Sequence, residues 1–154
     1  MISPLRQFIR ILALPVLCGA LWILPSATST AQTPHNTKLT VRITGIRNAQ
    51  GNLLVNLRRD ANTVVAARSL SINPRTLTAE TTFDDLPQGE YGVSVIHDEN
   101  QNGQLDFEPM GMPLEGYGHS NNPSKREGPP SFDETKFTLG PSAVAIEIKL
   151  INWP

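Results

Sequence analysis

Residues 83–97 read FDDLPQGEYGVSVIH and contain the clearest strand pattern of the chain. Within this stretch Tyr91, Val93 and Val95 alternate with other residues and share one face. A period of two is typical of a half-buried strand, because successive side chains point to opposite faces of a sheet. His97 falls at the next position of this alternation, on the same face as Tyr91, Val93 and Val95. We therefore expect it to point inward as a hydrogen-bonded core histidine.

Similar alternation recurs along the chain, which favours an all-β fold. The alternating runs are 39–44, 53–58, 76–83 and 143–150, with a shorter run at 137–139. The turn signal at 50–52 predicts that the first two runs form a hairpin with a long loop, and 63–72 reads either as a strand or as an irregular stretch. No window of a dozen residues after residue 31 has helical periodicity. Short strands separated by turns predict a two-sheet antiparallel β-sandwich, Ig-like, with Greek-key-like connections.

The N-terminus has the order of features that a secretory signal peptide requires. Arg6 and Arg10 precede an apolar run at 11–24, and the small-residue stretch 25–31 then leads to a predicted cut before Gln32. The alternative is an uncleaved membrane anchor. A spanning helix needs about 20 apolar residues, and this run has only 14. We therefore predict export to the periplasm or out of the cell, with no stable membrane span after cleavage.

The predicted division is a signal peptide at 1–31, a flexible lead-in at 32–37 and one β-sandwich domain at 38–154. Cys18 is the only cysteine and lies within the apolar run. Leu17 before it and apolar residues after it do not fit a lipid-attachment signal. The mature chain would have no thiol, which excludes disulfides, thiolate catalysis and cysteine metal sites.

Charge is distributed unevenly along the mature chain. Removing 31 residues from 154 leaves 123, and removing two of the 13 basic residues leaves 11 against 14 acidic ones, a formal charge of −3. This mild charge and the absence of a basic run argue against a nucleic-acid partner. Between Arg75 and Lys125 there is no Lys or Arg, so we expect the carboxylates there to need a counter-charge. These carboxylates are Glu80, Asp84, Asp85, Glu90, Asp98, Glu99, Asp106, Glu108 and Glu115.

The segment after the Tyr91 strand has the spacing of a calcium-binding loop. It reads D-x-N-x-N-G-x-x-D, with Asp98, Asn100, Asn102 and Asp106 around Gly103. Ca²⁺ takes six to eight oxygen ligands, and alternate residues of a tightly curved loop direct their oxygens to one centre. The glycine permits the sharp turn. The alternative is an Asn/Gly-rich turn selected for its backbone conformation alone.

The rest of the predicted calcium shell comes from the following residues. The backbone carbonyl of Gln104 is expected to supply the next ligand. The twelfth position, where a bidentate Glu belongs in an EF-hand, is Pro109, and the flanks are not helical. The distal carboxylate must then come from Glu108 or from Glu115 folding back.

Residues 107–132 are rich in proline and glycine and show no sustained alternation. A loop of this length in a compact domain is typically functional or disordered. Tyr117, His119, Asn121 and Asn122 offer a surface for a carbohydrate or cell-envelope component. The alternative is that Tyr117 only pins the loop to the sandwich. A transition-metal site at His97 and His119 has no recognisable spacing.

Two stretches resemble known families. The pattern F-x-x-L-P-x-G-x-Y at Phe83–Tyr91 resembles the strand entry of transthyretin-like and collagen-adhesin B-type sandwich domains. H-D-x-N-x-N-G-x-L-D at 97–106, the stretch 111–122 and P-S-F-D-x-x-x-F at 130–137 resemble the bacterial family called domain of unknown function 2141. The resemblance covers residues 38–153 and implies an exported β-sandwich, without bringing an established activity.

These observations predict an exported, non-enzymatic module stabilised by calcium. A carbohydrate or cell-envelope binding module is one alternative, and a transthyretin-related hydrolase of small molecules is another. The hydrolase chemistry needs a cluster of His and Arg with a serine-bearing C-terminus, whereas this chain ends Ile151-Asn152-Trp153-Pro154. No serine lies in a nucleophile-elbow motif either.

Overall fold

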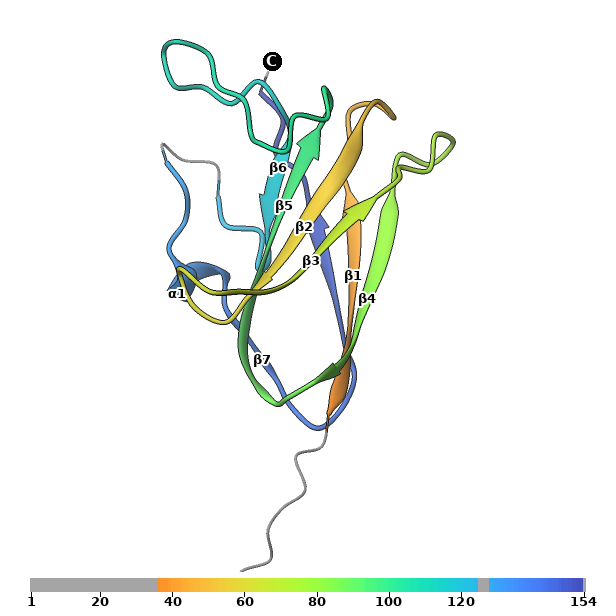
Figure 1. The fold of residues 1–154 in the computed structure, drawn as a ribbon, viewed down its shortest axis with the longest axis vertical. Helices are drawn as coiled ribbons and strands as arrows, with labels where there is room; N and C mark the ends of the chain where they lie inside the picture. Colours follow the sequence, from red (N-terminus) through yellow and green to blue (C-terminus); the bar gives the residue numbers. More distant parts are fainter. Residues whose placement is uncertain (1–35, 125–127, 154) are drawn as a thin grey trace, which may run out of the picture. The chain divides into compact units, whose positions relative to one another are not determined.

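A computed structural model describes residues 36–124 and 128–153 of the chain. Two β-sheets face each other in this part, as Figure 1 shows, so the predicted β-sandwich is confirmed. The strands are β1 (Thr37–Thr44), β2 (Asn52–Arg58), β3 (Val64–Leu70), β4 (Ala79–Leu86), β5 (Gly89–Asp98), β6 (Tyr117–His119), β7 (Phe137–Leu139) and β8 (Val144–Lys149). One short helix, α1 (Phe132–Thr135), precedes β7.

The larger sheet has the order β3-β2-β5-β6, and β7 pairs with the beginning of β5. Its strand β5 carries the alternation found in the sequence, and Tyr91, Val93 and Val95 are each 1% exposed. The phenol of Tyr91 donates a hydrogen bond to the Pro87 carbonyl at 2.8 Å, which fixes the entry to β5. His97 is fully buried on the same face, and its Nε2 lies 2.9 Å from the Gln50 carbonyl oxygen. The inward orientation expected for His97 is therefore confirmed.

The smaller sheet has the order β4-β1-β8. Its strand β1 buries Leu39, Val41 and Ile43 completely, and these side chains pack against the inner face of the larger sheet. β1 runs antiparallel to β4 but parallel to β8. The sandwich is thus not purely antiparallel, since the first and last strands of the domain lie side by side in one direction.

The predicted hairpin between the first two alternating runs is wrong. β1 pairs only with strands of the smaller sheet, whereas β2 pairs with β3 and β5 of the larger one. The connection at 45–51 crosses from one layer to the other. Alternation predicts that a strand exists, but both layers of a sandwich require the same alternation, so it does not identify the partner strand.

Two segments have more regular structure than their sequences indicated. The ambiguous stretch 63–72 contains β3, an edge strand whose Val64 and Val65 are 45% and 43% exposed. The loop 107–132 contains β6 and the first residue of α1. Neither has a sustained apolar period. β3 is mostly exposed on both faces, and β6 is only three residues long and contains a glycine.

The predicted signal peptide and residues 32–35 of the lead-in lie outside the described residues. β1 begins at Thr37, the last residue of that lead-in. Within the described part of the chain, no helix is long and apolar enough to span a bilayer.

Candidate functional site

Asp98 begins the candidate calcium loop at the end of β5. The β2–β5 ladder extends to the pair Asn52 and Asp98, so the position of Asp98 is set by the sheet. Asp98 is 1% exposed, and its two carboxylate oxygens accept backbone hydrogen bonds from Asn102 at 3.0 Å and Gly103 at 2.9 Å. Gly103 has a φ of +81°, where a side chain would be strained. The chain therefore turns tightly around the Asp98 carboxylate.

Two further side chains of the predicted set, those of Asn100 and Asn102, meet at the carboxylate of Asp106. The amide nitrogens of Asn100 and Asn102 lie 2.6 Å and 2.9 Å from Asp106 carboxylate oxygens. The amide oxygen of Asn100 accepts the Asn102 N–H at 3.1 Å, and that of Asn102 accepts the Gln104 N–H at 2.9 Å. The structure thus brings together the side chains of Asp98, Asn100, Asn102 and Asp106 around one turn.

Glu115 folds back on this loop, whereas Glu108 does not bond to it. Glu115 is 4% exposed, and its carboxylate accepts backbone hydrogen bonds from Glu99 at 2.8 Å and Asp106 at 3.2 Å. It therefore joins both ends of the loop. Glu108 is half-buried in a separate turn, where its N–H donates to the Met112 carbonyl.

Within residues 36–124 and 128–153, no three His, Cys, Asp or Glu side chains form a group suited to a metal ion. The carboxylates of Asp98, Asp106 and Glu115 each face amide N–H groups rather than one another. A cation in this loop would have to take amide or carbonyl oxygens in addition to carboxylates. The described residues also keep His97 and His119 apart, because His97 faces the core and His119 lies on the outer face of the larger sheet.

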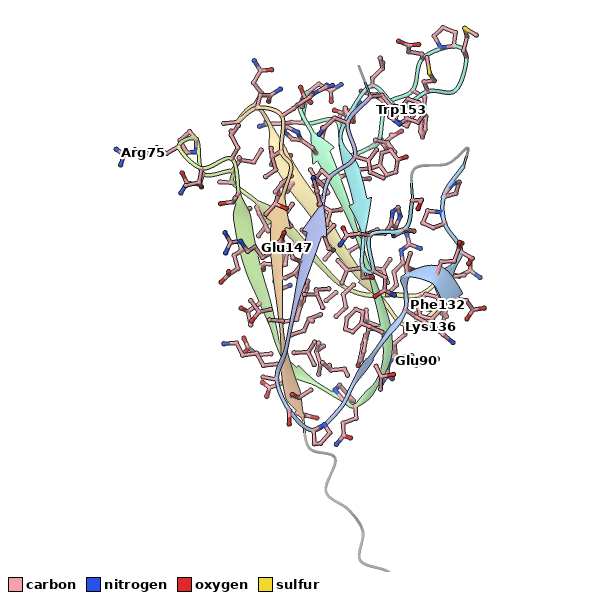
Figure 2. The ribbon with its side chains drawn as sticks, turned by 180° about the vertical axis from the view of Figure 1, so that it is seen from behind. Arg75, Glu90, Phe132, Lys136, Glu147 and Trp153 are labelled. Atoms are coloured by element: carbon pink, nitrogen blue, oxygen red, sulfur yellow. The ribbon has the colours of Figure 1, made fainter. Side chains whose placement is uncertain are left out.

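Part of the counter-charge for the acidic segment comes from distant residues of the same chain. Arg47, in the β1–β2 connection, pairs with Glu99 and donates to the Leu114 carbonyl at 2.7 Å. Lys136 lies 3.2 Å from Glu90, beside α1 in Figure 2. The expected need for a counter-charge is thus met in part, since folding supplies basic groups that the linear segment lacks. Among the described residues, no Lys or Arg pairs with Asp98, Asp106, Glu108 or Glu115.

The Glu99 carboxylate is held in its charged form by this arrangement. Burial raises the pKa of Glu99, but hydrogen bonds from Arg47 and Asn48 and the charges of Arg47 and His97 outweigh burial. The pKa of Glu99 therefore lies below its ordinary value. No local pattern indicates this contact, because Arg47 and Glu99 lie 52 residues apart.

The four residues proposed for carbohydrate contact divide into two pairs. The side-chain amide of Asn121 donates to the Lys136 carbonyl at 2.8 Å, and that of Asn122 donates to the Glu147 carbonyl at 2.9 Å. These two amides hold the chain after β6 against α1 and β8. Tyr117 and His119 instead lie edge to face on the outer side of β6, with ring centroids 6.2 Å apart.

A family described as an uncharacterized protein conserved in bacteria, DUF2141, matches residues 41–147, which is more than half of the chain. The chain belongs to the DUF2141 family. The DUF2141 match includes the whole 98–106 loop, Glu115 and α1. No curated protein and no solved structure matches this chain.

Proposed function

We propose that this DUF2141 protein is an exported, non-enzymatic β-sandwich module whose 98–106 loop binds Ca²⁺ as a structural staple. The observation that carries the proposal is the convergence of Asp98, Asn100, Asn102 and Asp106, which are joined by direct hydrogen bonds. Asp106 receives only neutral amide donors there. A divalent cation would neutralise the loop carboxylates more effectively than these donors do.

The proposed ligands are oxygens, which suits a hard cation. Asp98, Asn100 and Asn102 would each present a side-chain oxygen, Gln104 its carbonyl, and Asp106 its carboxylate directly or through water. The Asp98 oxygens already accept backbone N–H groups, but each retains a second lone pair for an ion. Glu115 would close the shell if its carboxylate turned inward, and it otherwise orients the loop through its two backbone contacts.

The expected affinity is that of an extracellular module. Two carboxylates within the loop predict a dissociation constant of roughly 10⁻⁴–10⁻³ M. At free calcium about 100-fold above this constant, binding would stabilise the fold by about 2.7 kcal/mol. Calcium would thereby fasten the β5–β6 connection to the sheet, which suits a permanent support in a calcium-rich extracellular medium.

Thermal unfolding in millimolar CaCl₂ and in excess chelator tests this proposal. We expect calcium to raise the melting temperature of the wild type by several degrees, and Mg²⁺ to do so much less, because it demands a tighter octahedral shell. Asp106→Asn should abolish most of the calcium effect. Asp85→Asn is the matched control, since it removes the same charge from an exposed position on β4. Equal melting temperatures of the wild type with calcium and with chelator would contradict the proposal.

We also propose that the sandwich is of the transthyretin-like or collagen-adhesin B type. Support comes from the entry to β5, where Leu86 and Pro87 precede a buried tyrosine hydrogen-bonded to the Pro87 carbonyl. The hydrolase alternative would need an accessible nucleophile. Ser120, for example, is 1% exposed and its hydroxyl contacts the Thr135 carbonyl, so it is not placed to act as a nucleophile.

A further inference from the structure

A cavity of about 850 Å³ lies on the outer face of the larger sheet, away from the sandwich core. Its floor is formed by β5 and β6, and its walls by the 105–113 loop on one side and the 128–132 segment with α1 on the other. Pockets for small organic ligands have volumes of about 300–1,000 Å³. The size of this cavity therefore suits a small molecule.

The register of the sheet gives the cavity floor two chemically different ends. Arg58 lies opposite Gly92, and His119 lies opposite Ser94, so a basic and an imidazole side chain flank two small residues of β5. Two residues further along β5, Ile96 lies opposite Tyr117. The floor is thus polar and basic toward α1, and apolar toward the loop that joins β5 to β6.

The walls reinforce the apolar end. Phe107, Met110 and Met112 line the cavity and are 55%, 88% and 41% exposed, which is unusual for large apolar side chains gathered on one loop. Figure 2 shows Trp153 at this end of the face and Phe132 at the α1 end, and both line the cavity. An apolar ligand body would cover these side chains.

Charge distinguishes the polar end. Among the described residues that line the cavity, Arg58 is the only charged one, and none is Asp, Glu, Asn or Gln. Arg58 donates to the Ala61 carbonyl at 2.9 Å, and no carboxylate of the described residues pairs with it. Burial lowers the pKa of His119, and the nearby charge of Arg58 lowers it further. The end of the cavity near α1 therefore carries the positive charge of Arg58, which is not paired with a carboxylate of the described residues.

We propose that this cavity binds a small amphipathic carboxylic acid, with its carboxylate between Arg58 and His119 and its alkyl or aryl body along Ile96 toward Phe107. Guanidinium and carboxylate form strong charge-assisted hydrogen bonds. The four steps along β5 from Gly92 to Ile96 span about 13 Å at about 3.3 Å per residue, which accommodates a body of eight to ten carbons. A sugar fits less well, because the described lining residues include no amide or carboxylate side chain that would accept hydrogen bonds from its hydroxyls.

Calorimetry with octanoate, 1-octanol and octyltrimethylammonium tests this proposal on the intact mature protein. We expect octanoate to bind most tightly and the ammonium compound not to bind detectably. Arg58→Met retains the aliphatic stem but removes the charge, so it should weaken octanoate binding by about tenfold or more and leave octanol binding unchanged. Arg75→Met, in the β3–β4 connection, removes the same charge outside the cavity and should bind octanoate like the wild type.

A second measurement needs no variant. The pKa of His119 is measured from the NMR shift of its ring proton. Saturating octanoate should raise this pKa, because a bound anion favours the protonated imidazole. Octanol should leave the pKa unchanged. Equal octanoate affinities of the wild type and Arg58→Met, or an unchanged His119 pKa at saturation, would overturn the proposal. Both experiments are run in calcium and in chelator. The outcome is read at Arg58 and His119, so it is separate from the calcium effect on melting.

Discussion

At the scale of single residues, Glu115 and Glu99 show two uses of a carboxylate beside the same loop. Glu115 is buried and satisfied by backbone N–H groups of Glu99 and Asp106, so it sets the separation of the two loop ends. Glu99 is paired with Arg47 and Asn48 from the β1–β2 connection, so it ties that connection to β5. The Arg47–Glu99 contact joins residues 52 positions apart, whereas Glu115 lies 16 and 9 positions from its two partners.

The lowered pKa of Glu99 predicts a dependence of stability on pH. A carboxyl whose pKa is depressed on folding stabilises the fold above its unfolded value, here 4.5, and this contribution is lost as pH falls through the folded value. Glu99→Gln should therefore lower the free energy of unfolding by about 1–2 kcal/mol near neutral pH. Urea unfolding of the wild type and of Glu99→Gln, measured from neutral to acidic pH, checks this. The difference between their free energies of unfolding should narrow below pH 4.5.

Glu90→Gln is the matched control for this experiment. Glu90 pairs with Lys136 on the surface, where its side chain is 55% exposed, and exposed ion pairs contribute little to stability. We expect a change of less than about 0.5 kcal/mol at any pH. A Glu99→Gln effect that is equally small, or that grows toward low pH, would contradict the role assigned to the Arg47–Glu99 contact.

At the scale of elements, the connection at 45–51 approaches the end of β5 very closely. A Cβ atom at Gly51 would lie 2.0 Å from the Asp98 carbonyl oxygen, and the residue has a φ of +66°. Both the backbone conformation and the space therefore demand glycine. The β1–β2 connection therefore packs directly against Asp98, the residue that begins the candidate calcium loop.

Gly51→Ala should consequently destabilise the protein by about 3 kcal/mol or more, because backbone atoms must move in addition to the cost of a strained φ. Gly111→Ala separates the two effects. Gly111 has a similar φ of +86° but nothing within 4 Å of an added Cβ, so we expect a loss of only about 1 kcal/mol. Chemical denaturation in chelator measures both variants, and equal losses would refute the close-approach argument.

Some strands can be predicted from their sequence, and others cannot. β1, β2, β5 and β8 have long alternating runs, and each forms near its predicted bounds. The sequence does not predict β6, because its three residues have Gly118 at their centre and no apolar alternation, whereas Phe137 and Leu139 indicate the equally short β7. Its Gly118 is required by packing, since a Cβ there would lie 2.8 Å from Ile148 in the other sheet. Such a requirement depends on a partner that only the fold brings close.

At the level of the whole molecule, the spacing of Asp and Asn residues in the sequence predicts the candidate loop. Their side chains converge because the chain makes one tight turn there. The contacts that surround the loop were not predictable in the same way. Arg47 reaches Glu99 across 52 positions, and the outer-face cavity combines residues of β2, β5, β6 and the C-terminal segment. Sequence patterns report local geometry, whereas these features depend on which strands become neighbours.

A crystal structure of the mature protein grown in millimolar CaCl₂ would show whether the turn around Asp98 binds calcium. We predict one ion with oxygens of Asp98, Asn100 and Asn102 at about 2.3–2.6 Å, and the Asp106 carboxylate bound directly or through one water. The amide nitrogens of Asn100 and Asn102 would then no longer be the partners of Asp106. A loop without an ion, in which both amides still donate to Asp106 at saturating calcium, would show that this turn is not a calcium site.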